Sequence, residues 1–226
     1  MNFKIITFAS DETNPIFKLL KSKLPLTLLS CENFDWAGKN TTPVLLNFLN
    51  TLLEDDLVLI CDSYDVLPLN DCTVDKLYNS ILNNFDLTKI TFNAETQCFP
   101  DKDLEDKYPI TPNKWRYLNG GLMTGKVKNL KNLLEIIISK KFEINQKIYA
   151  ELFLTTNLID LDYECRVFQT LLAGPYPDYP EIDMNDFIIE EKVITNKYFK
   201  TKPLLFHGNG SVRLAPLLPF IKTISS

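Results

Sequence analysis

Short apolar runs alternate with amphipathic stretches through the first hundred residues, and this alternation limits the fold more than any other feature. Compact apolar runs bounded by polar residues are typical of buried strands, and apolar residues spaced by three and four are typical of helices. The expected strands cover residues 3–9, 26–30, 57–61 and 89–93, and the expected helices cover residues 15–24, 43–53 and 74–85. Strands that alternate with helices build parallel sheets covered on both faces. The sequence therefore predicts an α/β fold with a mostly parallel, doubly wound central sheet flanked by helices.

The second half of the chain is less regular. A polar, proline-bearing segment follows residue 95, helices are expected over residues 127–138 and 146–156, and short strands mix with loops from residue 160 onward. No internal repeat, low-complexity tract or linker divides the sequence. The chain has 226 residues, and a domain of this size buries roughly 70% of the surface of its unfolded form. We therefore expect a single domain over residues 1–226.

Composition argues against several classes of protein. The net charge is -5 and the isoelectric point is about 5.0, and no stripe of Lys and Arg of the kind that binds nucleic acids or anionic membranes is present. No apolar run reaches the roughly 18 residues of a membrane span, and the first residues resemble a strand rather than a signal peptide. The cysteines are scattered without CxxC spacing, which indicates neither a disulfide framework nor a zinc site. We expect a cytoplasmic protein with no nucleic acid partner and no membrane span.

Two aspartates, Asp62 and Asp65, follow the apolar run LVLIC in the stretch DLVLICDSYDVL. In an open α/β sheet, ligands bind beyond the carboxyl ends of the strands. Residues three apart in a continuing strand point to opposite faces, so both carboxylates reach one ion only if the chain turns directly after Cys61. Aspartate is also a common turn residue, and a capping Asp62 with a solvated Asp65 is the ordinary alternative. The aspartates alone do not separate a metal site from a turn.

The single histidine of the chain, His207, narrows the choice of metal. One histidine excludes a site built from two histidines and a carboxylate, and any histidine-rich zinc site, within this polypeptide. A metal here must depend on carboxylates, which suit the hard ions Mg²⁺ and Mn²⁺ that accompany phosphates. His207 ends the apolar run LLF as Asp62 ends LVLIC, so it can supply a neutral imidazole at a strand end. A lone histidine on the surface or in the core is the alternative interpretation.

Five of the seven glycines lie in two short stretches, RYLNGGLMTGK and LLFHGNGSVR. We interpret both stretches as loops whose backbone approaches a ligand closely, although turns alone account for some of the glycines. These glycines are Gly120, Gly121, Gly125, Gly208 and Gly210. Arg213 ends the second stretch and is placed to meet a phosphate, with a solvated surface role as the alternative.

Several segments occur in the order and at the spacing of one known family. They read DSYDV, AETQCFPDKDLEDKYP, KWRYLNGGLMTG, DYECRVFQTL and HGNG. Over nearly its whole length the chain resembles the N-terminal glycosyltransferase domain of the procollagen lysyl hydroxylases, a family of procollagen galactosyl- and glucosyltransferases. The resemblance implies a GT-A type nucleotide-sugar-binding fold, with a nucleotide-binding half over residues 1–95 and a donor sugar and acceptor half over residues 96–226.

The same resemblance implies a reaction. The family transfers a hexose, glucose or galactose, from a UDP-sugar to the hydroxylysine of collagen-like chains, and uses Mn²⁺, with Mg²⁺ as the other candidate ion here. A divalent ion that bridges the two phosphates of UDP stabilises the negative charge of this leaving group as the glycosidic bond breaks.

Position by position, the resemblance implies roles for individual residues. Asp62, Asp65 and His207 match the metal ligands of the family. Tyr64 matches the residue that packs on the uracil. The candidate donor-binding residues are Tyr64, Asn119, Gly120, Gly121, Gly208, Asn209, Gly210 and Arg213.

The chain departs from the family near the donor sugar. The family has a run of aspartates directly before a glutamine, whereas this chain has Ile144 and Asn145 before Gln146. Glu143 precedes them and has an ordinary solvated position at a helix start as its simplest interpretation. The candidate catalytic residues are Glu95, Asn145 and Gln146. Because the acids are replaced, a catalytically impaired nucleotide-sugar-binding module is the alternative function.

A phosphohydrolase with Asp62 as the nucleophile is a third interpretation. It would require a DxD loop directly after the first strand, and that strand ends in FASDE. The sequence therefore favours the glycosyltransferase over the phosphohydrolase.

Overall fold

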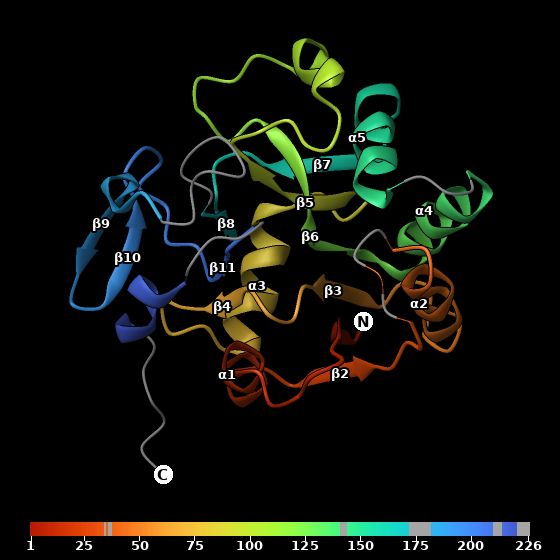
Figure 1. Ribbon diagram of the computed structural model, residues 1–226, viewed down its shortest axis with the longest axis horizontal. Coiled ribbons are helices and arrows are strands. Elements are labelled where there is room, and N and C mark those ends of the chain that lie inside the picture. Colours follow the sequence, from red (N-terminus) through yellow and green to blue (C-terminus); the bar gives the residue numbers. More distant parts are fainter. Residues whose placement is uncertain (34, 36–37, 141–143, 172–181, 210–213, 221–226) are drawn as a thin grey trace.

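The computed structural model describes residues 1–33, 35, 38–140, 144–171, 182–209 and 214–220. Its centre is a six-stranded sheet with the strand order β2-β1-β3-β6-β5-β7 (Figure 1). The strands are β1 (Phe3–Phe8), β2 (Leu26–Leu29), β3 (Leu57–Cys61), β5 (Ile90–Glu95), β6 (Tyr117–Lys126) and β7 (Ile159–Asp162). Neighbouring strands of this sheet are parallel except where β6 is involved, because β6 runs antiparallel to both β3 and β5. The predicted α/β fold with a mostly parallel central sheet is confirmed.

Strand β6 shows that the interpretation of RYLNGGLMTGK as a loop is wrong. Its three glycines, Gly120, Gly121 and Gly125, lie inside the longest strand of the sheet. Glycine weakens a strand taken alone, so the local pattern favours a loop. Because β3 and β5 pair with β6 on both sides, tertiary contacts outweigh this local preference. The register with β5 shifts between Phe92 and Asn93, where residues 120–122 of β6 have no counterpart in β5.

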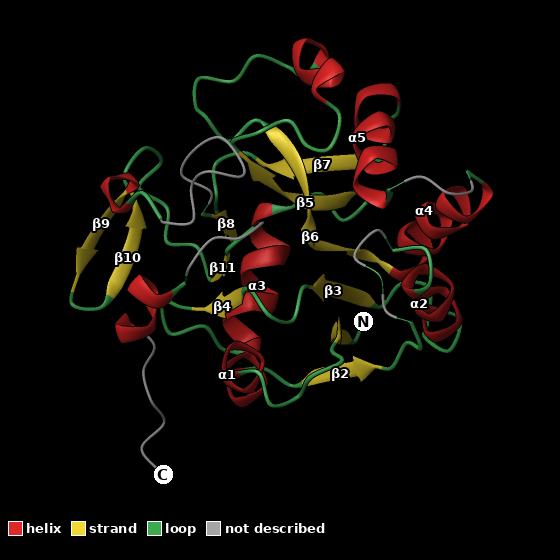
Figure 2. Cartoon of the chain, viewed as in Figure 1, coloured by secondary structure: helices red, strands yellow, loops and turns green. Residues whose placement is uncertain are grey.

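Helices cover both faces of the sheet (Figure 2). They are α1 (Pro15–Lys23), α2 (Thr41–Leu49), α3 (Val74–Asn84), α4 (Val127–Ser139) and α5 (Asn145–Thr155). Successive residues of a strand point to opposite faces, so the sheet separates two hydrophobic clusters. Ile5 lies in the cluster with Leu20 of α1 and Leu77 of α3. Its neighbour Ile6 lies in the cluster with Leu45 of α2 and side chains of α4 and α5.

A second, three-stranded sheet continues from the end of β3. Its order is β4-β11-β8, formed by β4 (Val66–Pro68), β11 (Leu205–His207) and β8 (Phe168–Thr170). The hairpin of β9 (Phe187–Glu190) and β10 (Val193–Asn196) packs beside this sheet, and 3-10 helices cover Lys102–Lys107, Met184–Asp186 and Ala215–Phe220. His207 pairs with Val66, and Gly208 N donates to the Asp65 carbonyl oxygen at 2.8 Å. This pairing returns the late part of the chain to the turn after β3.

Of the helices in the described residues, none combines the length and the apolar character that crossing a membrane requires.

Candidate functional site

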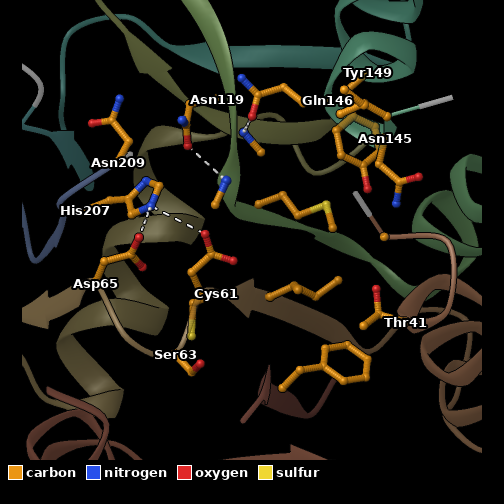
Figure 3. Close-up of a pocket in the computed structure, with 18 of the residues that line it drawn as sticks. Thr41, Cys61, Ser63, Asp65, Asn119, Asn145, Gln146, Tyr149, His207 and Asn209 are labelled. Carbon is orange, nitrogen blue, oxygen red and sulfur yellow. Dashed lines mark hydrogen bonds and ion pairs between the residues drawn. The ribbon is translucent and has the colours of Figure 1, made fainter. Parts of the chain in front are cut away.

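A cavity of about 780 Å³ opens at the carboxyl ends of β3 and β5, beside the N-terminal ends of α2 and α5 (Figure 3). Most of the predicted site residues line it: Asp62, Tyr64, Asp65, Glu95, Asn119, Gly120, Gly121, Asn145, Gln146, His207 and Asn209. Gly208 is described but is not part of this lining. Gly210, Arg213 and Glu143 lie outside the described residues. The fold therefore gathers predicted residues from both halves of the chain around one space.

The turn expected after Cys61 is present one residue further on. β3 ends at Cys61, Asp62 N still donates to the Gly121 carbonyl oxygen of β6 at 2.9 Å, and the chain bends over residues 63–65. The chain then turns and enters β4 at Val66. Two carboxylates that would point to opposite faces of a straight strand are thereby brought to one side of the sheet.

Asp62, Asp65 and His207 converge at one point of the cavity. Each offers one ligand atom, and these atoms all lie within 4.8 Å of one another. His207 Nε2 lies 3.4 Å from a carboxylate oxygen of Asp62 and 3.4 Å from one of Asp65. His207 is buried, whereas the side chain of Asp62 is open to the cavity. The three predicted metal residues are therefore close together, with their ligand atoms facing one another.

The chemistry of these three residues fits a divalent cation. Two carboxylates and one imidazole give mainly oxygen ligands with excess negative charge, which suits Mn²⁺ and Mg²⁺. Asp65 Oδ1 is buried and has no hydrogen-bond partner among the described residues, so its lone pairs remain available. Burial alone would lower the pKa of His207, but the carboxylates of Asp65 and Asp62 raise this pKa to about 10. In the absence of a metal ion, a proton on Nε2 therefore takes the position between the carboxylates.

The surroundings of Gly121 explain why glycine occupies the middle of β6. A Cβ atom at this position would lie 2.1 Å from His207 Cε1 and 2.7 Å from a carboxylate oxygen of Asp62. A larger residue would therefore displace both side chains. At Gly120, a Cβ atom would lie 3.2 Å from Gln146 Oε1, which is the end of a flexible side chain. The side chains that approach Gly121 closely are thus two of the predicted metal residues, Asp62 and His207.

Glu95, the last residue of β5, is surrounded by three amide side chains that we call the amide ring: Asn119, Gln146 and Asn209. Asn119 Nδ2 and Gln146 Nε2 donate to Glu95 Oε1 at 3.2 and 2.9 Å. Asn209 Nδ2 donates to Glu95 Oε2 at 2.8 Å. Burial raises the pKa of Glu95 to about 7, against the lowering effect of the amide donors and of His207. A carboxylate with this pKa can accept a proton from a substrate near neutral pH.

Gln146 uses both ends of its amide within the protein. Gly120 N donates to Gln146 Oε1 at 2.9 Å. Besides Glu95, Gln146 Nε2 donates to the carbonyl oxygens of Phe99 and Leu118 at 3.1 and 3.3 Å. These contacts join the first turn of α5 to β6 and to the segment after β5. They are the contacts of a residue that positions Glu95, and the catalytic role of Gln146 stays a prediction.

Asn145 connects α5 to α2. Asn145 Nδ2 donates to Thr42 Oγ1 at 2.8 Å, and the same hydroxyl donates to the Gly38 carbonyl oxygen at 2.6 Å. Gly38 has a φ of +89°, and a Cβ atom there would lie 2.0 Å from Asn145 Nδ2. The position of Asn145 therefore depends on a glycine and a threonine that no sequence pattern links to the site. Its direct part in catalysis stays a prediction.

Tyr64 lies between the two acidic residues in sequence, and its side chain lines the cavity. Its hydroxyl accepts hydrogen bonds from the backbone N–H groups of Ser10 and Asp11, each at 2.6 Å. Its ring packs edge-on against Phe17, with 6.5 Å between the ring centroids. The ring is thereby fixed beside the end of β1, and its stacking on a uracil stays a prediction.

One buried polar residue at the site, Asn93, is not indicated by any motif in the sequence. Its side-chain amide lies 3.2 Å from His207 Nδ1, the ring nitrogen that faces away from the carboxylates. The only signal is its position two residues before Glu95 on the same strand, because such residues point to the same face of a sheet.

Comparison with known proteins gives the family. The family model of the PLOD GT domain matches residues 31–219, which is most of the chain. The chain belongs to the PLOD GT domain family. The match extends over every predicted site residue, from Asp62 to Arg213. The resemblance to the glycosyltransferase domain of the procollagen lysyl hydroxylases is confirmed, and the chain is by family a glycosyltransferase domain.

Individual relatives of this PLOD GT domain include viral and animal proteins. An uncharacterized protein of Acanthamoeba polyphaga mimivirus is 26% identical over 170 residues, which cover 75% of this chain and 34% of that protein. Procollagen-lysine,2-oxoglutarate 5-dioxygenase 1 of Gallus gallus is 31% identical over 168 residues, covering 71% of this chain and 22% of the relative. The multifunctional procollagen lysine hydroxylase and glycosyltransferase of Caenorhabditis elegans is 29% identical, and the match covers 91% of this chain and 30% of the relative. The chain spans about a third or less of the length of these relatives.

Solved structures agree with the fold. A glycosyltransferase involved in the glycosylation of the major capsid of PBCV-1 has a TM-score of 0.55 at 13% identity, covering 97% of this chain and 98% of that chain. Mouse xyloside xylosyltransferase 1 has a TM-score of 0.56 at 12% identity, covering 94% of this chain and 99% of that chain. At these identities the likeness concerns the fold alone, and it is the GT-A fold.

Proposed function

We propose that this PLOD GT domain transfers a hexose, glucose or galactose, from a UDP-sugar to a hydroxyl acceptor, with Mn²⁺ or Mg²⁺ held by Asp62, Asp65 and His207. The observation that carries the proposal is the convergence of these residues in a cavity that also contains Glu95. Carboxylates that face one another destabilise a fold unless a cation or proton lies between them. The His207 proton balances these carboxylates when no metal is bound, but it leaves Asp65 Oδ1 without a partner, and this open oxygen supports the binding of a cation with a phosphate-bearing substrate.

The side chains have separate tasks in this proposal. A divalent ion at the three metal residues supplies the positive charge that stabilises UDP as it leaves. Glu95 accepts the proton of the acceptor hydroxyl while that oxygen bonds to the anomeric carbon and the glycosidic electron pair leaves with UDP. The amide ring holds the Glu95 carboxylate in one orientation during this step. In this proposal the ring of Tyr64 stacks on the base.

The acceptor in this proposal is the hydroxylysine of a collagen-like chain. Support comes from the Caenorhabditis elegans relative, whose name joins procollagen lysine hydroxylase and glycosyltransferase. It also comes from Phe99, which lines the cavity and is still 42% exposed. An apolar side chain at the edge of the cavity gives an extended acceptor a surface to pack on.

A second candidate function is a nucleotide-sugar-binding module without turnover. It is favoured by one observation, the replacement of the family's acids by Ile144 and Asn145 at the start of α5. An isoleucine cannot orient sugar hydroxyls or accept a proton as a carboxylate does.

Release of UDP separates the two candidates. We would measure UDP release with Mn²⁺ from UDP-glucose, UDP-galactose and their N-acetyl forms, with and without a hydroxylysine peptide. The proposed enzyme releases UDP from at least one UDP-hexose, and EDTA or Asp65→Ala abolishes the release. Asp55→Ala is the matched control, because Asp55 forms exposed ion pairs with Lys126 and Lys128 away from the cavity. Binding of UDP with no release from any donor would establish the module instead.

A further inference from the structure

We propose that Asn93 is a positioning residue of the metal centre: its side-chain oxygen accepts a hydrogen bond from His207 Nδ1–H and holds Nε2 toward the metal. The inference rests on the proposed metal-dependent function, which makes Nε2 a ligand. Asn93 is fully buried in β5, and with its oxygen toward the ring the distance to Nδ1 is 3.2 Å. Nothing in the family resemblance assigns a role to this position.

The surroundings of the two imidazole nitrogens decide which nitrogen carries the hydrogen. Nε2 lies 3.4 Å from oxygens of both Asp62 and Asp65. When a metal ion occupies this space, Nε2 offers its lone pair, so the neutral ring must carry its hydrogen on Nδ1. When a proton occupies the space instead, the ring is an imidazolium and Nδ1 again carries a hydrogen. In both states Nδ1 is a donor, and its neighbour Asn93 must present an acceptor.

The backbone of β6 selects the same orientation of the Asn93 amide. The other end of this amide lies 2.6 Å from the Asn119 carbonyl oxygen and 3.1 Å from the Leu122 carbonyl oxygen. Two carbonyl oxygens require a donor and together outweigh the single Leu122 N–H group, which lies 3.3 Å from the same end, so this end is the NH₂ group and the oxygen faces His207. One carbonyl directly precedes residues 120–122, which have no counterpart in β5, and the other belongs to the last of them. The Asn93 side chain therefore replaces the missing strand partner and orients the metal histidine at the same time.

Removal of the amide should weaken the metal centre without removing a ligand. A buried Nδ1–H group that loses its acceptor has no hydrogen bond to offset the cost of its desolvation. The ring then favours other orientations or tautomers, in which Nε2 no longer offers its lone pair to the metal. Partners that hydrogen-bond a metal-bound histidine typically change metal affinity by about 10- to 100-fold. Asn93 does not line the cavity, so its effect passes through its neighbours, and His207 is the only one of them that is also a metal residue.

The first test is Mn²⁺ affinity, measured with UDP by isothermal titration or by the electron paramagnetic resonance of free Mn²⁺. We expect Asn93→Leu to weaken Mn²⁺ binding by about 10- to 100-fold. The matched control is Asn196→Leu, because Asn196 is also a buried strand asparagine but bonds to Gln169 Oε1 in another part of the fold. The control should lose stability and keep wild-type affinity for Mn²⁺. Wild-type affinity in folded Asn93→Leu would overturn the proposal, as would equal losses in both variants.

The second test needs no variant and uses the single histidine of the chain, whose imidazole nitrogens require no assignment. Long-range ¹H–¹⁵N correlation spectra of wild-type protein with Mg²⁺ and UDP report which ring nitrogen is protonated. We expect Nδ1 to be protonated and Nε2 to be unprotonated, and an unprotonated Nδ1 would overturn the role of Asn93. A wild-type protein that binds no divalent ion would overturn the proposed metal centre. The Nδ1 signal of that metal-free protein would still decide whether Asn93 acts as the acceptor.

Discussion

The two ends of the cavity differ in their chemistry. The metal end, formed by Asp62, Asp65 and His207, carries charges whose ligand atoms face one another across a few ångströms. The α5 end, formed by Asn145 and Gln146, is neutral, and its amides are bonded to other parts of the protein. Figure 3 shows Asp65 and His207 on one side of the space and Asn145 on the other.

This difference indicates which part of the reaction each end can serve. Charges held close together with an open lone pair can bind a cation and the phosphates that accompany it. Amides that are bonded to other parts of the protein can instead fix the shape of the space and the orientation of Glu95. Loss of charge should therefore be decisive at the metal end and near Glu95, and loss of a single amide should matter least at the α5 end.

Among variants that keep all three metal residues, the largest effect is expected for Glu95→Gln, which removes the charge near the junction of the two ends and keeps the shape of the side chain. General base catalysis contributes about 10²- to 10⁴-fold to rate, so the rate of transfer should fall by this factor. Affinity for UDP with Mn²⁺ should remain close to wild type, since Glu95 is not one of the metal residues. Glu12→Gln is the control, because Glu12 forms an exposed ion pair with Lys21. Transfer at the wild-type rate by Glu95→Gln would remove Glu95 from the reaction.

Gly121→Ala should have the next largest effect and acts only on the metal end. The added Cβ would collide with His207 Cε1 and an Asp62 oxygen, so the ligand atoms must move apart. We expect Mn²⁺ affinity to fall by about 100-fold, which is the upper end of the range for changes in the residues around metal ligands. Gly125→Ala is the matched control in the same strand, where the nearest atom, Ile90 Cγ1, is 3.2 Å from the added Cβ. Equal Mn²⁺ affinities in a titration of both variants would contradict the packing of the metal end.

The pH dependence of metal binding sharpens the comparison further. Without metal, the carboxylates hold the pKa of His207 at about 10, so at lower pH an incoming ion must displace a proton. Affinity for Mn²⁺ should therefore rise about tenfold per pH unit from pH 6 and level off as the pH approaches this pKa. Calorimetry in buffers of different ionisation enthalpy should detect release of about one proton per ion. Affinity that is independent of pH in this window would show that the ion does not displace a proton from His207.

Asn145→Ala should have a smaller effect than Glu95→Gln and Gly121→Ala. It removes the hydrogen bond to Thr42 at 2.8 Å, a loss of about 1 kcal/mol, which corresponds to about a fivefold decrease in turnover if α5 shifts. Steady-state turnover at saturating donor would measure this decrease. Glu143→Gln, in the segment outside the described residues, should change turnover less. A loss as large as that of Glu95→Gln would instead make Asn145 a group that contacts the substrate.

Local patterns predict much of the fold because they report burial. The apolar runs identify β1, β2, β3 and β5, and the helical spacing identifies α1 to α5 within a few residues of their ends. The same patterns fail for β6, since its glycines are favourable only beside β3, β5 and the metal residues. Whether such a stretch is a strand depends on partners that are far away in sequence.

The site residues also divide into those that local sequence patterns predict and those that they do not. Asp62 and His207 can be found because each ends an apolar run, where a ligand is expected in an α/β sheet. The amide ring around Glu95 could not be derived from the residues, because its members come from β6, α5 and the segment after β11. Asparagine and glutamine in those segments have no periodic signal of their own, and only the family resemblance draws attention to them. Asn93 lacks even that signal.

The pairing of β11 with β4 has a consequence for how the protein opens. β11 has only three residues, and its last one is His207, so a metal ion would join this short strand to the turn after β3. The ion would then act as a reversible cross-link between segments distant in sequence, and local unfolding of the three-stranded sheet would require its release. Backbone amides of β4, β8 and β11 should exchange hydrogen with solvent much more slowly when Mn²⁺ and UDP are present. Departure of the product and opening of this small sheet would then share one kinetic step.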